Sequence, residues 1–308
     1  MNELPLLGLD GGNPLAFLAS LGLLRVISFS KPHLSPRLSW APQLGAHRPI
    51  LHTAAAIDPL GFVGELALRL SALEATPTFD FKDDLSFSLE ESREYLAGAA
   101  RSSHDGNLRH AEFAAGFMGD VHTTESGLVE DTALRTMSGA GHQHFLKFMR
   151  NLMEQTGDEH LYKALFLSWR YDDAVSNMTM RWDPADDCLY ALRWNDPSGD
   201  RERGSRGAMW GANRLAIEGL PLLPVMAGKK QLESTGFQTA GRRCTFWTWP
   251  IWNMPLELDS VRSLLALKAM QDLQPDRSDL AARGVIEIYR SQRLTVGKFR
   301  NFTRGLPA

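Results

Sequence analysis

Apolar residues dominate the first part of the chain and recur there at the spacing of a helix. The leucines that set this spacing are Leu15, Leu18, Leu21 and Leu24. Asn13 is a favourable N-cap residue, and Pro14 suits the first helical position. Because apolar side chains point in most directions around this segment, we expect a buried helix. The preceding residues 4–10 predict a short buried strand.

Three glycines, Gly8, Gly11 and Gly12, lie between the predicted strand and the predicted helix. A phosphate-binding loop has the same order of elements, but this sequence lacks both the GK[ST] ending and the GxGxxG spacing. Glycine alone adopts positive φ without steric cost, so we interpret the three glycines as a tight turn. Anion binding at the N-terminus of the helix is the alternative.

The rest of the chain alternates between helical periodicity and short strands. The expected helices cover residues 58–73, 88–100, 109–118, 158–168, 210–220 and 258–273, with another inside 136–155. The expected strands cover residues 36–40, 49–53, 177–183, 188–194 and 243–252, with a strand pair inside 284–302. Short mixed strands interrupted by helices, without strict βαβ alternation, predict an α+β fold. We expect either an acidic lobe at 1–130 and a basic lobe at 131–308, or a single domain.

The composition is that of an ordinary globular protein of 308 residues, with 44% hydrophobic and 22% charged residues. Lys and Arg number 33 against 36 Asp and Glu, and the resulting net charge of -3 gives no nucleic-acid signal by itself. The apolar run at 15–29 contains Arg25 and is shorter than the roughly 20 residues of a membrane span. No signal-peptide pattern opens the chain, so we expect a cytoplasmic protein with no membrane contact.

The two cysteines, Cys188 and Cys244, fit a reducing compartment better than a disulfide-bonded secreted fold. Neither belongs to a CxxC pair, so we expect two core thiols rather than a structural zinc site, and no cofactor. The sequence has no GxSxG motif, so nothing indicates a serine nucleophile of that type.

Basic residues are concentrated in two windows of the rear half of the chain. Residues 201–243 contain eight basic and three acidic residues, and residues 283–304 contain six and one. The residues that we expect to contact nucleic acid are Arg201, Arg203, Arg206, Arg214, Lys229, Lys230, Arg242, Arg243, Arg290, Arg293, Lys298, Arg300 and Arg304. Guanidinium groups bind phosphates, and the interleaved aromatic residues offer faces for unpaired bases. The alternative is that these charges pair with the acidic front half of the chain, within one molecule or between subunits.

Two clusters of metal-ligand residue types raise a metal-dependent nuclease as an alternative function. His142 and His144 would share one face on a strand, but on a helix they diverge by about 200°. The acidic cluster consists of Asp183, Asp186 and Asp187, and a separate His-Asp dipeptide lies at His104 and Asp105. The acidic cluster lacks the EF-hand spacing, and an Asp-Pro step is typical of a turn.

Three stretches of the sequence resemble proteins of type I-G (formerly I-U) CRISPR systems. LDGGNPLAFLASLGLLRVI at 9–27, followed by PRLSW at 36–40, resembles the N-terminal signature of subunits from those systems. TMSGAGHQHFL at 136–146 resembles a helix start in their large-subunit-like proteins. MRWDPADDCLYALRWNDPS at 180–198 and GANRLAIEGLPLLPV at 211–225 resemble the family found alone or as an extension of the signature helicase–nuclease.

The resemblance implies a non-catalytic subunit of an RNA-guided antiviral effector complex, and it carries over no catalytic residue. The implied partners are other CRISPR effector subunits or the helicase–nuclease, together with DNA, guide RNA or both. In such complexes base pairing reads the sequence, while protein binds the backbone. A pure protein adaptor, whose basic tail contacts an acidic surface of a neighbour, is the remaining alternative.

Overall fold

The computed structural model describes residues 1–73, 77–137, 144–174, 178–185, 207–240, 244–272, 274–296 and 299–308. Within these ranges helices and antiparallel strands form an α+β fold, which confirms the predicted fold class. No helix in this part of the chain is long and apolar enough to cross a membrane.

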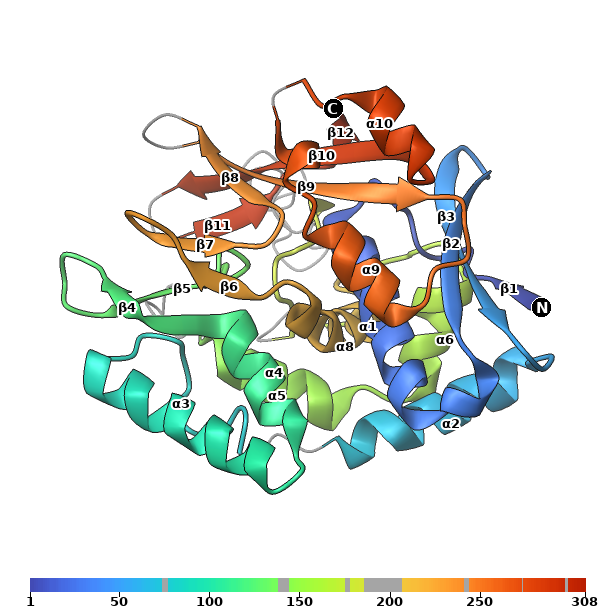
Figure 1. The fold of residues 1–308 in the computed structure, drawn as a ribbon. Coiled ribbons are helices and arrows are strands. Elements are labelled where there is room, and N and C mark those ends of the chain that lie inside the picture. Colours follow the sequence, from blue (N-terminus) through green and yellow to red (C-terminus); the bar gives the residue numbers. More distant parts are fainter. Residues whose placement is uncertain are drawn as a thin grey trace, which may run out of the picture.

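Two helices form the centre of the molecule (Figure 1). The first, α1 (Pro14–Ser30), is buried for most of its length and lies against α8 (Trp210–Gly219). A Cβ on Gly22 of α1 would lie only 1.8 Å from the carbonyl oxygen of Leu215 in α8. Only a residue without a side chain therefore allows the two backbones to approach this closely.

The start of α1 follows the prediction from the sequence. The side chain of Asn13 accepts hydrogen bonds from the backbone N–H groups of Leu15 (2.9 Å) and Ala16 (3.4 Å). Pro14 occupies the first helical position, where its missing N–H leaves no hydrogen bond unmade. The N-terminus of α1 is therefore capped by its own chain.

The glycine turn before α1 has a different cause from the one predicted. None of Gly8, Gly11 and Gly12 has a positive φ. A Cβ on Gly8 would lie 2.3 Å from the carbonyl oxygen of Ala164, and one on Gly11 would lie 2.9 Å from Cδ1 of Ile251. These two positions are glycine because neighbouring segments come close to the backbone, so the positive-φ explanation was wrong.

Two antiparallel sheets lie beside this helix pair. The smaller sheet has the order β1 (Asn2–Pro5), β3 (Ala46–Thr53) and β2 (Arg37–Gln43). The larger sheet has the order β11 (Phe299–Phe302), β10 (Val285–Val296), β9 (Cys244–Trp252) and β8 (Phe237–Ala240), with β12 (Leu306–Pro307) also paired to β10. The strands predicted around 36–40 and 49–53 and the strand pair predicted at 284–302 are thereby confirmed.

An aromatic cluster connects α1 to both sheets. The ring centroid of Phe17 in α1 lies 5.8 Å from that of Trp40 in the smaller sheet and 5.6 Å from that of Trp249 in the larger sheet. The indole N–H of Trp249 donates to the carbonyl oxygen of Gly11 at 2.8 Å. Hydrophobic residues from both sides of residue 130 belong to one core cluster.

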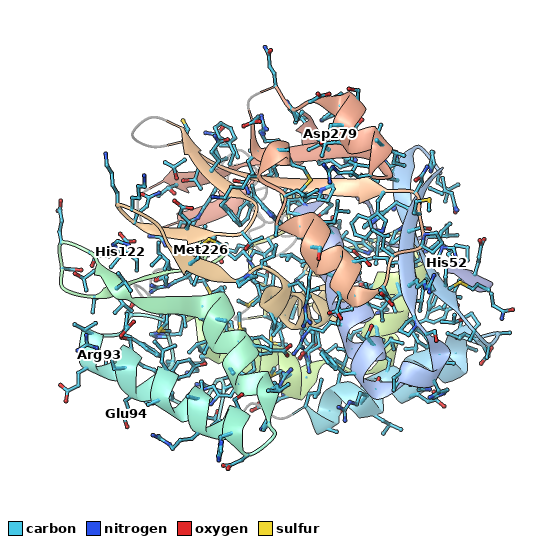
Figure 2. The ribbon with its side chains drawn as sticks, in the orientation of Figure 1. His52, Arg93, Glu94, His122, Met226 and Asp279 are labelled. Atoms are coloured by element: carbon cyan, nitrogen blue, oxygen red, sulfur yellow. The ribbon has the colours of Figure 1, made fainter. Side chains whose placement is uncertain are left out.

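Further helices and two β-hairpins surround the central pair. The helices are α2 (Pro59–Ala72), α3 (Leu89–His104), α4 (Leu108–Phe117), α5 (Phe145–Gln155), α6 (Asp158–Phe166), α9 (Leu258–Leu265) and α10 (Arg277–Ala282), with 3₁₀ helices η1 (Pro32–Leu34), η2 (Leu220–Leu222) and η3 (Lys268–Gln271). The hairpins pair β4 (Met118–Thr123) with β5 (Val129–Asp131) and β6 (Val225–Ala227) with β7 (Leu232–Ser234). The hairpins lie side by side (Figure 2), since Nε2 of His122 lies 2.9 Å from the carbonyl oxygen of Gly228.

Local capping signals in the sequence correctly located two of these helices. Asp58 caps α2 by accepting a hydrogen bond from the backbone N–H of Gly61 at 2.7 Å. Ser88 and Glu91 form a reciprocal capping box at the start of α3. Polar side chains at these positions satisfy backbone N–H groups that have no partner inside the helix.

The strand predicted at 4–10 is shorter and more exposed than expected. It is β1, which ends at Pro5 and is exposed at three of its four positions. The backbone N–H of Leu6 still donates to Pro49 in β3, whereas that of Gly8 donates to Leu165 outside the sheet. The chain therefore leaves the sheet between Leu6 and Gly8, before it reaches α1.

The strand predicted at 177–183 is not formed in the part that the structure describes. Arg181 has a φ of 57°, which interrupts an extended backbone. The backbone N–H of Met180 donates to the side-chain oxygen of Asn213 at 3.0 Å, so a side chain satisfies it instead of a neighbouring strand. The predicted partner strand at 188–194 lies outside the described residues.

The helix predicted at 258–273 ends earlier than its pattern suggested. It covers α9 only, and the next position on its apolar face would be Lys268. The chain leaves the helix after Leu265 and forms η3, which buries Met270 to 1% exposure. Met270 is thus buried from a 3₁₀ turn and not from a continued α-helix.

Candidate anion-binding cleft

The structure describes seven of the thirteen basic residues that were predicted to bind nucleic acid. The other six, Arg201, Arg203, Arg206, Arg242, Arg243 and Lys298, lie outside the described residues. The seven described residues lie in different parts of the fold, and two of them come together in a cleft.

Two of the seven, Arg214 and Arg290, are held by contacts within the protein away from the cleft. Arg214 is 1% exposed, and it donates to Oε1 of Glu218 at 2.7 Å and to the carbonyl oxygen of Leu70 at 3.0 Å. Arg290 donates to the carbonyl oxygen of Asp272 at 2.6 Å. The buried charge of Arg214, neutralised in this way, presents nothing to a ligand at the surface.

Three others lie on the surface at two separate places. Lys229 and Lys230 are exposed in the turn between β6 and β7. Arg304, which follows β11, donates to Oδ2 of Asp10 at 2.6 Å beside the start of α1. Asp10 belongs to the front half of the chain. This ion pair therefore agrees with the alternative that the basic residues pair with the acidic front half within one molecule.

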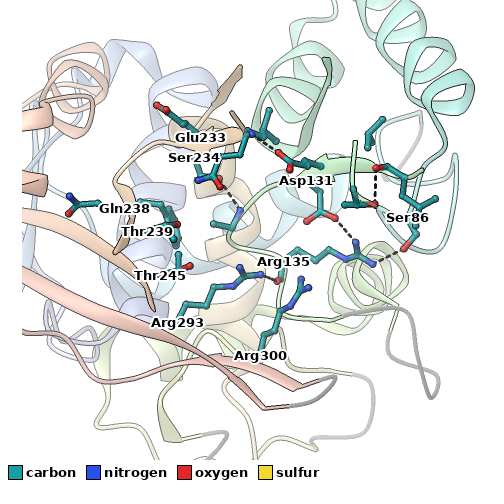
Figure 3. Close-up of a pocket in the computed structure, with 18 of the residues that line it drawn as sticks. Ser86, Asp131, Arg135, Glu233, Ser234, Gln238, Thr239, Thr245, Arg293 and Arg300 are labelled. Carbon is teal, nitrogen blue, oxygen red and sulfur yellow. Dashed lines mark hydrogen bonds and ion pairs between the residues drawn. The ribbon is translucent and has the colours of Figure 1, made fainter. Parts of the chain in front are cut away.

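Arg293 and Arg300 lie together because of the register of β10 and β11. Arg300 pairs with Thr295 across the two strands, and Arg293 lies two residues before Thr295. Side chains two residues apart on a strand point to the same face, so the two arginines are diagonal neighbours on one face of the sheet. Both side chains line a cleft of about 690 Å³ (Figure 3).

Segments far apart in the sequence form the walls of this cleft. One side comes from the larger sheet, and the other comes from the two hairpins and the segments next to them. Polar side chains dominate the lining, and Gln238, Thr239 and Thr245 lie on the sheet side with the arginines (Figure 3). The cleft therefore offers hydroxyl and amide groups near a concentration of positive charge.

A third arginine, Arg135, lies in the same cleft and was not among the predicted residues. Its Nη2 donates to Oδ2 of Asp84 at 2.7 Å, its Nη1 pairs with Asp131, and its Nε donates to the carbonyl oxygen of Met137 at 2.7 Å. In the sequence Arg135 is an isolated charge outside both basic windows, so no local signal identified it. Its partners show that it holds the cleft wall together.

The other two arginines lack carboxylate partners. Arg293 donates through Nη2 to the carbonyl oxygen of Arg135 at 2.9 Å, but its buried Nε has no hydrogen-bond partner in the described part of the chain. Burial, reinforced by the positive charge of Arg300, lowers the pKa of Arg293 to about 10 against the opposing effect of Asp131. The group is still cationic at neutral pH.

Arg300 makes no hydrogen bond or ion pair with any other described residue, although its side chain lines the cleft. An unsatisfied buried donor destabilises a protein by about 1–3 kcal/mol, so an unpartnered Nε such as that of Arg293 favours an added acceptor. The pair formed by Arg293 and Arg300 can therefore hold an anion.

The hairpin side of the cleft carries the opposite charge. Glu130 accepts a hydrogen bond from the backbone N–H of Leu232 at 2.5 Å, and Glu233 is exposed. Figure 3 shows Glu233 across the cleft from Arg293 and Arg300. Glu130 and Glu233 thus lie on the hairpins and Arg293 and Arg300 on the sheet, while the buried carboxylate of Asp131 attracts both arginines without forming an ion pair with either.

The structure describes only some of the residues on which the alternative of a metal-dependent nuclease depends. Four residues singled out above lie outside the described ranges: His142, Asp186, Asp187 and Cys188. Asp183 is 2% exposed and accepts hydrogen bonds from Asn13 and from the hydroxyl of Tyr171, and burial raises its pKa. His144 directly precedes α5. Within the described ranges no three His, Cys, Asp or Glu side chains are arranged to hold a metal ion.

Comparison with known proteins gives no match to the chain, whether with protein-family models, with curated proteins or with solved structures.

Proposed function

We propose that this protein is a non-catalytic subunit of an antiviral CRISPR effector complex and binds backbone phosphate of a nucleic acid through Arg293 and Arg300. The observation that carries the proposal is the pair of guanidinium groups without carboxylate partners on one wall of a polar cleft. The resemblance of three sequence stretches to type I-G CRISPR proteins supports the assignment to an effector complex.

The chemistry of the two arginines suits binding rather than catalysis. A guanidinium group donates up to five hydrogen bonds in a planar arrangement that matches phosphate oxygens, and it does not accept a proton at neutral pH. Neighbouring hydroxyl groups such as those of Thr239 and Thr245 add the polar contacts that position a nucleic-acid backbone. Sequence recognition is left to base pairing in this proposal.

Fluorescence anisotropy with labelled single-stranded DNA, single-stranded RNA and duplex DNA across a salt series tests nucleic-acid binding. We expect the double variant Arg293→Gln/Arg300→Gln to bind at least tenfold more weakly than the wild type. For a single strand its salt slope should fall by about 0.7 for each phosphate that the variant no longer neutralises. Circular dichroism would verify that the variant is folded.

A matched control removes an arginine of the same basic window that lies outside the cleft. Arg283 is about half exposed and pairs with Asp279 on α10 at 3.2 Å. The Arg283→Gln variant should therefore bind nucleic acid like the wild type. Equal binding by the control variant and the cleft variant, or no binding to any of the three nucleic acids at low salt, would overturn the role of the cleft.

Assignment to an effector complex needs a separate experiment. The full chain would be co-expressed with the remaining type I-G effector subunits and with the helicase–nuclease, followed by affinity purification of the chain. We expect at least one of these proteins to co-elute in stoichiometric amount. Purification of the chain alone under all conditions would refute the assignment, and association that depends on Arg300 and Arg304 without nucleic-acid binding would identify an adaptor instead.

A further inference from the structure

We infer that the cleft binds the phosphorylated end of a nucleic-acid strand, a single terminal phosphomonoester, rather than a continuing phosphodiester backbone. This inference rests on the proposed function, because it names the part of the nucleic acid that the same site takes. The observations behind it are the number, the placement and the partners of the charges that line the cleft.

The positive charge in the cleft is confined to one place. Of its three arginines, Arg135 is shared between Asp84 and Asp131, so its charge is fully engaged inside the protein. Only Arg293 and Arg300 are left to attract a ligand. Because they are diagonal neighbours on one sheet face, they can contact the same phosphate group.

The opposite side of the cleft disfavours a strand that passes through. Three carboxylates line the cleft, those of Glu130, Asp131 and Glu233, and they equal the number of its arginines. A continuing backbone carries one negative charge per nucleotide, so the phosphates leaving the arginine pair would approach Glu130 and Glu233. Physiological salt screens charges over roughly 8 Å, so a phosphate closer than this to either carboxylate is repelled with little screening.

The charge of a terminal phosphate matches the arginine pair better than that of a diester does. A phosphomonoester carries about -1.5 to -2 charges at pH 7 and three acceptor oxygens, whereas a phosphodiester carries one negative charge. Two guanidinium groups, one of them with a buried Nε that lacks a partner in the described part of the chain, supply two positive charges and several donors. The pair therefore gains most from a ligand that brings two negative charges to one point.

The rest of the lining suits a single nucleotide at the end of a strand. A volume of about 690 Å³ falls inside the range of ~300–1,000 Å³ that small-ligand sites occupy. Carboxylates such as Glu233 accept hydrogen bonds from sugar hydroxyls and base amino groups, and Gln238 both donates and accepts. Phe237 also lines the cleft, but its ring is stacked on that of Trp247 with ring centroids 5.7 Å apart. We therefore assign the ligand contacts to the polar side chains and not to this ring.

Competition binding with one oligonucleotide sequence in three forms tests the inference. The forms carry a 5′-phosphate, a 3′-phosphate or hydroxyl groups at both ends, and they share an internal fluorophore. With the full-length wild type we expect at least one phosphorylated form to bind tenfold or more tightly than the form with two hydroxyl ends. The two phosphorylated arms identify which end the cleft takes.

Three variants assign this preference to the cleft. Arg300→Gln should reduce the preference to less than twofold, and circular dichroism of this variant verifies that its partly exposed position tolerates the change. Glu233→Gln should improve binding of the form with two hydroxyl ends, because it removes a negative charge from the opposite wall. Arg283→Gln should leave all three affinities unchanged.

The outcomes separate the inference from the proposed function. Equal affinity of the wild type for all three forms, with binding still weakened by Arg300→Gln, would overturn the terminal-phosphate inference and leave backbone binding in place. Absence of binding to every form would overturn both. A preference for a phosphorylated end that survives Arg300→Gln would place that preference outside this cleft and would also overturn the inference.

Discussion

We expect the protein to lose stability when the buried carboxylate of Glu218 is removed. It lies in α8 with no exposed surface, and three guanidinium groups contact it. Arg214 lies at 2.7 Å, Arg109 at 2.5 Å and Arg25 at 3.2 Å from its oxygens. These contacts connect α8 to α1 and α4, so Glu218 neutralises positive charge where three helices meet.

The expected loss of stability can be calculated from the cost of leaving these arginines without the carboxylate that they share. Breaking a buried ion pair by removing one side costs about 3–5 kcal/mol, since the remaining charge stays buried. At about 2.1 cal/mol/K per residue, the unfolding entropy of 308 residues is roughly 0.65 kcal/mol/K. Glu218→Gln should therefore lower the melting temperature by about 5–8 °C.

The effect should also depend on pH in a defined direction. Burial by itself would raise the pKa of Glu218, but the guanidinium groups of Arg109, Arg214 and Arg25 lower it far below its usual range. The stabilisation is therefore fully present above the unfolded-state pKa of about 4.5 and is lost as the pH falls further. The difference between wild type and Glu218→Gln should stay constant from about pH 8 to about pH 5.5 and narrow below about pH 4.5.

Differential scanning calorimetry and urea titration at several pH values measure both effects. Glu65→Gln is the matched control, because Glu65 is exposed and pairs with Lys31 at the surface. Such pairs contribute about 0–1 kcal/mol, so the control should shift the melting temperature by less than about 2 °C. A shift for Glu218→Gln no larger than that of the control would refute the assignment of Glu218 as the centre of this network.

Two further predictions concern the helix crossing and a buried histidine. Gly22→Ala should destabilise the protein by about 1–3 kcal/mol or more, because the added Cβ would overlap the carbonyl oxygen of Leu215, whereas Gly64→Ala in α2 has open space and should stabilise it by about 0.5–1 kcal/mol. Melting temperatures that shift equally for the two variants would contradict this. His110 is 3% exposed with neither ring nitrogen hydrogen-bonded in the described part of the chain, and burial lowers its pKa. The free energy of unfolding should therefore fall as the pH drops below about 6.5, in total by about 1.4 kcal/mol for each unit by which folding lowers the pKa of His110. In urea titrations between about pH 7 and about pH 5, His110→Phe should flatten this pH dependence. An unchanged pH dependence in that variant would show that His110 is not its source.

Features encoded over a few residues could be predicted from the sequence. The cap at Asn13 and the capping box of Ser88 and Glu91 depend on a side chain and the backbone next to it. The helix α5 lies inside the range predicted from helical spacing, and Phe145, Phe148, Met149 and Leu152, which set that spacing, are all buried. In each case the interacting groups are close in sequence, so the physical cause is visible without knowing the fold.

Features that depend on distant partners could not be predicted in this way. The strand expected at 177–183 was wrong because Asn213, far along the chain, satisfies a backbone group there. The interpretation of Arg214 as a surface residue counted charge along the sequence, whereas its guanidinium group is buried and donates to the carbonyl oxygen of Leu70, which is far away along the chain. Basic windows record how many charges a segment holds but not which of them are already paired.

The candidate site combines residues that the sequence analysis singled out with residues that it missed. Arg293 and Arg300 lay in one basic window and in a predicted strand pair, but the register that makes them diagonal neighbours was not predicted. Arg135 and Glu233 reach the same cleft only through the arrangement of the two hairpins against the larger sheet. Charge separation across the cleft is therefore a property of the fold and has no counterpart in the linear pattern.

The residues that line the cleft come from distant parts of the sequence, and this has a consequence while the chain is being synthesised. Its walls need residues near 130, near 233 and near 300 at the same time, so ribosome-bound chains that have emerged only as far as β9 lack both guanidinium groups that would hold an anion. The phosphate affinity that we propose for this cleft should accordingly arise late and abruptly, when β10 and β11 pair. Incomplete chains would then be unable to compete with finished molecules for their ligand.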